Sequence, residues 1–361
     1  MRAWVIRATG GLDQLDLADV PDPGAGGGPA TLGPREVRVA LRAAALNHLD
    51  LHVVRGLPHE YRFPHILGAD GAGVVETAGT GVRSVRPGDR VMINPGIADY
   101  TCQYCRAGEH SLCVNYRLLG EHLPGTLAER IVVPEQNIAL IPALASPLSW
   151  AEAAAFSLVT LTAWRMVVTR AQVRPGETVL IWGIGGGVSL AAMRIAKLRG
   201  AKVIVTSSSD AKLRAAQELG ADVALNHTTR TVSQEVRALT DRRGAEVVIE
   251  HVGEATWASR CGRSVAGGGS SPAVRPRARM WRSTCAVYSG ISGPSWARPW
   301  GTTRSTARLC GCSGPGSYGR PWTESFRSPT RARRSSGWSE GSSWEKSSWR
   351  SPPDGLGEAL S

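Results

Sequence analysis

Residues 177–206 read ETVLIWGIGGGVSLAAMRIAKLRGAKVIVT. The apolar stretch 177–182 predicts a β-strand, the glycine-rich run 183–189 a turn, residues 190–198 an amphipathic helix, and residues 201–206 a second strand. Strand, turn, helix and strand in this order form a βαβ unit of a parallel sheet. Glycines let the backbone approach a pyrophosphate, and a helix N-terminus supplies N–H groups. The stretch therefore predicts an α/β dinucleotide-binding domain, with a glycine-rich turn of another α/β fold as the alternative.

A second motif lies upstream, where Asp99, Cys102, Cys105 and Cys113 fall within 15 residues. Short gaps of this kind bring ligands together around Zn²⁺, and soft thiolates favour zinc over magnesium or calcium. Four protein ligands close the tetrahedral shell and leave no position for a substrate. The motif therefore predicts one structural Zn²⁺ site, and the alternative is three unpaired, reduced thiols.

The length and the charge distribution limit the function classes. A chain of 361 residues has room for two domains. The net charge is +12, but residues 264–361 hold 14 Lys and Arg against 5 Asp and Glu, while the first 263 residues hold 28 against 25. The basic excess therefore does not indicate a nucleic-acid partner. No apolar run is long enough for a signal peptide or a membrane span, which predicts a soluble, cytoplasmic protein without a membrane partner.

The composition of residues 264–361 differs from that of the rest of the chain. This segment has 21 Ser, 13 Arg, 14 Gly, 9 Pro and 7 Trp, but only 7 Leu, Ile and Val together. Such a composition predicts a disordered or aberrant tail, because it buries too little apolar surface to offset chain entropy. Codons for Trp, Cys and many for Ser begin with T, so a one-base shift turns them into codons for aliphatic residues. We therefore interpret the tail as a frameshift product, with an Arg/Ser/Trp-rich interaction tail as the alternative.

The remaining segments give the domain order. Residues 1–150 are rich in short strands and turns. Residues 151–263 continue the alternation of helices and strands after a helical stretch at 150–170. Expected strands are 2–6, 36–41, 71–76, 90–93, 138–141, 222–225 and 246–250, and expected helices are 212–219 and 232–239.

Several motifs in this order are similar to those of a known family. They are the strand turn Val82–Val91, the glycine-rich segment Gly68–Val75 and the segment Gly120–Glu129 after the cysteines. Up to about residue 258 the chain resembles the medium-chain dehydrogenase/reductase family of zinc-type alcohol dehydrogenases and quinone oxidoreductases. The resemblance implies an α/β protein with a β-rich, GroES-like catalytic domain at 1–150, including a structural-zinc lobe at 94–116. It also implies a partial Rossmann NAD(P)-binding domain at 151–263, followed by the tail at 264–361.

The chain departs from this family where members with catalytic zinc bind it. The matching positions are Asn47, Ala69 and about Leu158, none of which binds zinc well, and Leu49 replaces the proton-relaying Ser or Thr. The resemblance therefore implies an NAD(P)H-dependent oxidoreductase without catalytic zinc. It would transfer hydride to or from a small carbonyl, alcohol, enone or quinone.

Three residues at the active-site turn implied by the resemblance are candidate catalytic residues: Asn47, His48 and Asp50. An amide donor or a histidine can stabilise the oxygen charge that develops during hydride transfer. The alternatives are an ordinary loop histidine at His48, turn ordering by Asp50 and a structural hydrogen-bonding role for Asp70. No histidine is spaced along the sequence with an acidic or thiol group as in a zinc site.

The end of the second strand of the βαβ unit bears on cofactor choice. An acidic residue there selects NAD by binding the ribose 2′-OH. Ser207, Ser208 and Lys212 suit a 2′-phosphate instead, and we interpret Asp210 as the cap of the next helix. NADP(H) is therefore favoured, with NAD(H) as the alternative. The remaining cofactor-binding candidates are Gly183, Gly185, Gly186, Gly187 and Val188, with Thr162, Val252 and Gly253 added by the resemblance.

A second function class is a truncated, non-catalytic member that cannot complete its cofactor domain. Loss of the family's closing strands would leave an open sheet edge, and dimers of the family pair through that region. A family-like homo-oligomer is therefore doubtful. The partner that we expect is a small-molecule substrate, whose identity the sequence does not name.

Overall fold

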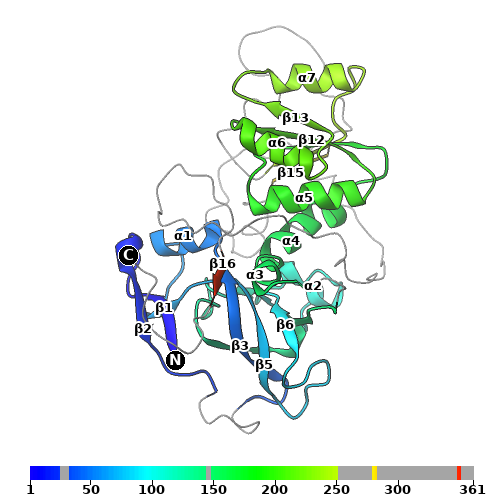
Figure 1. Cartoon of the computed structure of the whole chain (residues 1–361). Helices are drawn as coiled ribbons and strands as arrows, with labels where there is room; N and C mark the ends of the chain where they lie inside the picture. The colour runs from blue at the N-terminus through cyan, green and yellow to red at the C-terminus, as the bar shows by residue number, and fades with distance from the viewer. Residues whose placement is uncertain (25–31, 144–147, 251–278, 283–347, 351–361) are drawn as a thin grey trace. The chain divides into compact units, whose positions relative to one another are not determined.

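A computed structural model describes residues 1–24, 32–143, 148–250, 279–282 and 348–350 (Figure 1). The chain divides into two compact units. The first contains Met1–Ala154 and the strand at 348–350, and the second starts at Ala155 and contains the strand at 279–282.

The first unit is built on antiparallel sheets. A three-stranded sheet has the order β2-β1-β4, and a larger sheet has the order β10-β6-β5-β3-β16 with β9 also paired to β3. Valine, leucine and isoleucine side chains of β3, β5, β6 and β9 form its buried core. The strands are β1 (Arg2–Ile6), β2 (Leu15–Asp19), β3 (Glu36–Ala45), β4 (His65–Ile66), β5 (Asp70–Ala78), β6 (Arg90–Ile93), β9 (Arg130–Pro134), β10 (Ile138–Leu140) and β16 (Ser348–Arg350).

Short elements between these strands carry the polar side chains of interest. The hairpin β7 (Gly96–Ile97) with β8 (Arg117–Leu118) encloses α2 (Gln103–Arg106) and the 3₁₀ turn η3 (His110–Leu112). Helix α1 (His48–Arg55) follows β3, where the sequence indicated only a turn. Its cap explains the difference, because Asn47 and Asp50 form a capping box that starts a helix. The other short helices are η1 (Leu12–Gln14), η4 (Glu135–Asn137) and α3 (Trp150–Ala154).

One buried carboxylate fastens the loop after β5. Glu135, 6% exposed, accepts the backbone N–H groups of Arg83 at 2.6 Å and Ser84 at 2.7 Å, and the guanidinium of Arg35 at 3.1 Å. The N–H of Arg83, followed by that of Ser84, lowers the pKa of Glu135 to about 2. The anionic carboxylate thus holds two chain segments together.

Acid is expected to weaken this anchor. The pKa of Glu135 is about 2 in the folded chain against 4.5 as its ordinary value, so the unfolded chain binds more protons between these two values. The stabilisation is therefore present above about pH 4.5 and is lost as the pH falls toward 2. We expect Glu135→Gln to lower the free energy of unfolding by about 2 kcal/mol at pH 7 and to flatten its pH dependence below 4.5. Urea unfolding of both proteins at pH 7, 4 and 3 checks this, and parallel curves would contradict it.

The second unit is a parallel sheet with the strand order β13-β12-β11-β14-β15. Alternate side chains of β11 point to opposite faces of this sheet. Val179 and Ile181 pack with α4, α5 and α6, whereas Leu180 packs with α7. The elements are α4 (Ser157–Trp164), the π-helix η5 (Arg165–Arg170), β11 (Thr178–Ile181), α5 (Gly187–Leu198), β12 (Lys202–Ser207), α6 (Asp210–Glu218), β13 (Val223–Asn226), α7 (Val232–Leu239), β14 (Val247–Glu250) and β15 (Arg279–Arg282).

Two strands of the tail pair with the sheets of the two units, whereas the truncated-chain hypothesis expects an open sheet edge. β15 pairs in parallel with β14 over Val247–Glu250, so the edge that the truncated-chain hypothesis leaves open at β14 is covered. β16 pairs antiparallel with Ala43–Ala45 of β3. The rest of the proposed frameshift segment lies outside the described residues, and the hypothesis stays a prediction. Within the described ranges, no helix is both long and apolar enough to cross a membrane.

Candidate functional site

The glycine loop of the second unit is held against the end of β12. Ile184 N donates to the carbonyl of Thr206 at 2.7 Å, and Gly183 N donates to the Thr206 hydroxyl at 3.3 Å. The Ser189 hydroxyl donates to the carbonyls of Gly183 at 3.1 Å and Gly186 at 2.9 Å. α5 begins directly after Gly186, so its first N–H groups adjoin the loop. This is the arrangement that binds a pyrophosphate.

Lys212 of α6 reaches the same loop. A Cβ atom at Gly185, which has φ +125°, would come within 2.7 Å of Cδ and 3.3 Å of Nζ of Lys212. The lysine side chain therefore occupies the space beside the glycine, and its ammonium group lies at the loop. Ser207 at the end of β12 is buried, and Ser208 next to it is exposed.

The prediction for Asp210 is wrong by one residue. Ser209 caps α6, and its hydroxyl accepts the N–H of Lys212 at 3.5 Å. Asp210 is the first helical residue, and its carboxylate accepts the side-chain amide of Asn226 at 2.7 Å. Ser209 takes the cap because it keeps extended backbone angles while Asp210 is already helical.

The structure describes only some of the other residues that are predicted to bind the cofactor. Thr162 lies in α4, which packs against α5, and its hydroxyl donates to the carbonyl of Leu158 at 2.8 Å. Val188 is half-buried in the first turn of α5, directly after Gly187. Val252 and Gly253 lie outside the described residues.

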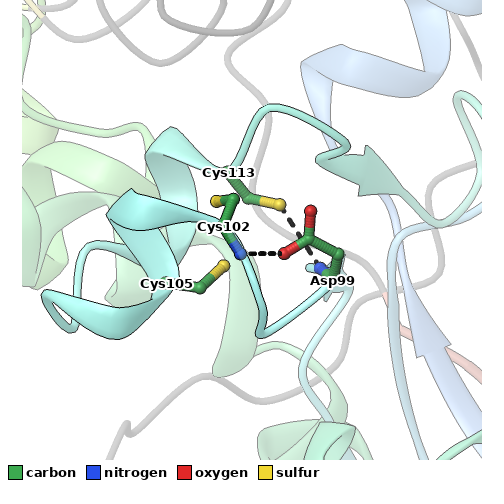
Figure 2. Close-up of side chains that lie close together, drawn as sticks. All are labelled: Asp99, Cys102, Cys105 and Cys113. Carbon is green, nitrogen blue, oxygen red and sulfur yellow. Dashed lines mark hydrogen bonds between the residues drawn. The ribbon is translucent and has the colours of Figure 1, made fainter.

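The structure brings Asp99, Cys102, Cys105 and Cys113 together in the first unit (Figure 2). One ligand atom from each lies within 4.8 Å of all the others. The Asp99 carboxylate accepts the N–H groups of Thr101 at 2.8 Å and Cys102 at 3.0 Å, and the Asn115 amide at 2.8 Å. Figure 2 shows the aspartate facing the Cys113 sulfur, which accepts the Asp99 N–H at 3.3 Å.

Charge is distributed unevenly in this cluster. The backbone N–H groups of Cys102 and Thr101 hold the pKa of Asp99 well below its usual range, so its carboxylate is ionised. A hydrogen bond from the Cys105 backbone lowers the pKa of Cys102. Burial, followed by bonds from the neighbouring thiols, raises the pKa of Cys105 to about 12. A divalent metal ion beside this buried thiol would favour its thiolate form.

The predicted catalytic residues lie at the start of α1. The Asn47 amide donates to Asp70 Oδ2 at 3.0 Å and to the carbonyl of Ala45 at 3.3 Å. Asp50, 1% exposed, accepts the N–H of Asn47 at 2.7 Å and that of Gly68 at 3.1 Å. Both amide hydrogens of Asn47 and both oxygens of Asp50 thus take part in bonds that fix the first turn of α1 to the end of β3 and to the start of β5.

His48 is the first helical residue of α1, and it is solvent-accessible although neighbouring groups cover part of its imidazole. Desolvation, followed by the charge of His52 one turn along, lowers the pKa of His48. Its imidazole is therefore neutral at pH 7 and carries one N–H donor. Of the two residues in this unit that the resemblance matches to catalytic-zinc ligands, Asn47 is bonded as above and Ala69 is fully buried.

A second group of side chains that could hold a metal ion was not predicted from the sequence. His59, Glu121 and His122 place one ligand atom each within 4.8 Å of the others. His59 and Glu121 are 62 positions apart, so their spacing in the sequence gives no signal. Only the fold, which places the loop after α1 beside the turn after β8, brings them together.

The sequence matches two families of known domains. Residues 33–143 match the alcohol dehydrogenase GroES-like domain, and residues 187–272 match the zinc-binding dehydrogenase domain. The NAD-dependent alcohol dehydrogenase of Sulfurisphaera tokodaii is 32% identical over 65% of this chain and 67% of its own length. The quinone oxidoreductase of Pseudomonas aeruginosa is 32% identical over 69% and 66%. The crystal structure of an NAD-dependent alcohol dehydrogenase superposes with a TM-score of 0.66 at 49% identity, covering 72% of this chain and 73% of that one.

The glycine loop on a parallel sheet and the β-rich unit with its cysteine lobe define a nicotinamide-dependent oxidoreductase that transfers hydride. The chain belongs to the medium-chain dehydrogenase/reductase family, which includes zinc-type alcohol dehydrogenases and quinone oxidoreductases. Its matched segments span about two thirds of the length of these relatives.

Proposed function

We propose that this chain uses NADPH to reduce a small carbonyl, enone or quinone without a catalytic zinc ion. The observation that supports this most is the chemistry at the family's zinc-ligand positions. Asn47 is bound to Asp70 through its amide, and Ala69 and Leu158 offer only hydrocarbon side chains. The Asn47–Asp70 bond ties α1 to β5 directly, at a place where other members hold a metal ion.

In the proposed reaction, NADPH held by the glycine loop and Lys212 would supply hydride to the substrate carbon, and negative charge would develop on the substrate oxygen. Neutral His48 donates a hydrogen bond to that oxygen, and solvent supplies the proton that completes the reduced product. Asn47 and Asp50 act as positioning residues, because their hydrogen bonds fix the first turn of α1. Using Asn47 as the donor instead would cost one of its two existing bonds.

The cysteine lobe fits a structural zinc ion. Three thiols and an ionised carboxylate form the required donor set, and the buried thiol of Cys105 gains most from a cation. Zn²⁺ held by Asp99, Cys102, Cys105 and Cys113 would join α2 and η3 to the hairpin β7–β8. All four positions would be protein ligands, so the ion would stabilise the lobe and take no part in hydride transfer.

The proposed preference for NADPH rests on Lys212, Ser207 and Ser208 near the glycine loop, with Asp210 bonded to Asn226. We expect Lys212→Ala to raise KM for NADPH by roughly 10- to 100-fold, because a charged hydrogen bond contributes about 1.5–3 kcal/mol. KM for NADH should change less than threefold. Lys202→Ala, which removes an exposed lysine from the start of β12, is the matched control. Equal changes for both cofactors would contradict the assignment.

Binding of NADPH separates this proposal from the alternative of a truncated, non-catalytic chain. Titration of the full chain, followed by NADPH fluorescence, should show saturable binding. Oxidation of NADPH should then follow on addition of one member of a panel of aldehydes, enones and quinones. Binding without turnover on the whole panel would favour the non-catalytic chain, and no binding would sink both the proposed reaction and the cofactor assignment.

A further inference from the structure

We propose that His59, Glu121 and His122 form a second metal site that takes a borderline divalent transition-metal ion such as Zn²⁺. This site is separate from the cysteine lobe and from the reaction proposed above, and it does not depend on either. Two imidazoles and a carboxylate are a donor set that zinc accepts in proteins. With three protein ligands, a fourth position stays open for water or a small anion.

The ligand atoms are close to the spacing that an ion requires. His122 Nε2 lies 3.8 Å from Glu121 Oε1, and all three ligand atoms lie within 4.8 Å of one another. Bonds of about 2.0–2.1 Å in a tetrahedral shell separate ligand atoms by about 3.4 Å. The side chains therefore need to close by on the order of 1 Å. Glu121 is 3% exposed, and the two histidines are half-buried.

The surroundings of the histidines suit a ligand role in part. His59 Nε2 lies 3.4 Å from the carbonyl oxygen of Glu121. When Nε2 carries the ring proton and donates it to this carbonyl, Nδ1 keeps the lone pair that a metal ion binds. Ligating histidines commonly bind a backbone carbonyl in this way.

Two existing contacts oppose the ion and must change when it binds. The N–H of Leu118 donates to His122 Nδ1 at 3.3 Å, and the rings of His59 and His122 stack at 4.9 Å with 10° between their planes. The hydrogen bond is at the long end of the normal range, and half-buried rings can turn. Metal–ligand bonds to three side chains outweigh one long hydrogen bond and one ring stack.

An ion here would also stiffen the start of α1. A Cβ atom at Gly120 would approach the carbonyl oxygen of Gly68 to 2.5 Å, so the backbones of these two segments touch. Gly68 N in turn donates to Asp50. Fixing Glu121 therefore fixes Gly68 and, through Asp50, the first turn of α1. The site joins the loop after α1 to the turn after β8.

Metal stoichiometry of the full chain tests the proposal. After loading with Zn²⁺ and gel filtration, mass spectrometry should find two zinc ions in the natural chain. His59→Gln and Cys113→Ser should each retain one, and the double variant none. His227→Gln, which removes a histidine of the second unit, should retain two. A natural chain with one zinc that is lost in Cys113→Ser and kept in His59→Gln would overturn the proposal.

The absorption spectrum of bound Co²⁺ provides a readout that does not depend only on the number of bound ions. Co²⁺ bound to thiolates absorbs through sulfur-to-metal charge transfer, whereas Co²⁺ at imidazole and carboxylate shows only d–d bands. Cys113→Ser should therefore keep a cobalt spectrum without charge transfer, and adding Glu121→Gln should remove it. If Cys113→Ser does not fold, the natural chain and Glu121→Gln alone should differ by that d–d component. A spectrum unchanged by Glu121→Gln would overturn the site.

Discussion

Replacing Cys113 with serine is expected to release zinc from the cysteine lobe and to lower the thermal midpoint of the first unit by roughly 6–12 °C. Cys113 is 1% exposed, and it packs with Ala98 and Cys105 in a small apolar cluster. Loss of a metal ligand there costs about 3 kcal/mol because zinc binding and folding are coupled. For a domain of this size, 1 kcal/mol corresponds to about 2–4 °C.

Controls for this prediction come from the same chain. Cys261→Ser removes a thiol that the proposed zinc site does not use, and it should change neither zinc content nor the midpoint. Asp99→Cys should tighten zinc binding by roughly 10-fold, since a thiolate is a softer ligand than a carboxylate. Calorimetry and zinc analysis of the four proteins provide the measurements. Equal zinc content in Cys113→Ser and the natural chain would favour the alternative of three unpaired thiols.

Replacing His48 with alanine should lower kcat by about 100-fold, because loss of one donor to a developing oxyanion costs about 10²–10³. KM for the cofactor and the thermal midpoint should be unchanged, since the side chain is exposed and alanine suits the first turn of a helix. His48→Gln keeps an N–H donor and should recover part of the rate. Steady-state kinetics with the best substrate of the panel is the measurement.

Arg55→Ala is the matched control for His48, because it removes an exposed side chain from the other end of α1. It should leave kcat within about threefold of the natural chain, the size expected for a distant surface charge. Equal losses in His48→Ala and Arg55→Ala would assign the effect to the helix and not to a donor. An unchanged kcat in His48→Ala would remove His48 from the proposed reaction.

The sequence predicted those parts of the structure that depend on local patterns. The βαβ unit follows from apolar periodicity and from glycines such as Gly185, whose φ of +125° few other residues adopt. The cysteine lobe follows from gaps short enough for a single loop to close. Strands from 2–6 to 246–250 were found within a few residues of their predicted bounds.

Other features depend on contacts that the sequence does not reveal. α1 was missed because its eight residues mix polar and apolar side chains, although Asn47 and Asp50 carry the capping-box pattern. His59 and Glu121 meet only through the fold. The sequence does not reveal that the Asn47 amide donates to Asp70, because Asp70 belongs to another strand, β5. Sequence patterns therefore found the scaffold and the lobe, but not the hydrogen bonds that assign roles within the site.

The most direct test of the proposed hydride transfer is deuterium transfer from NADPH that carries deuterium at both C4 positions of the nicotinamide. The full chain and His48→Ala would be compared in a single turnover with the best substrate of the panel. The proposed reaction predicts deuterium on the reduced carbon of the product, formed about 100-fold more slowly by the variant. Product without deuterium, or equal rates in the two proteins, would contradict it.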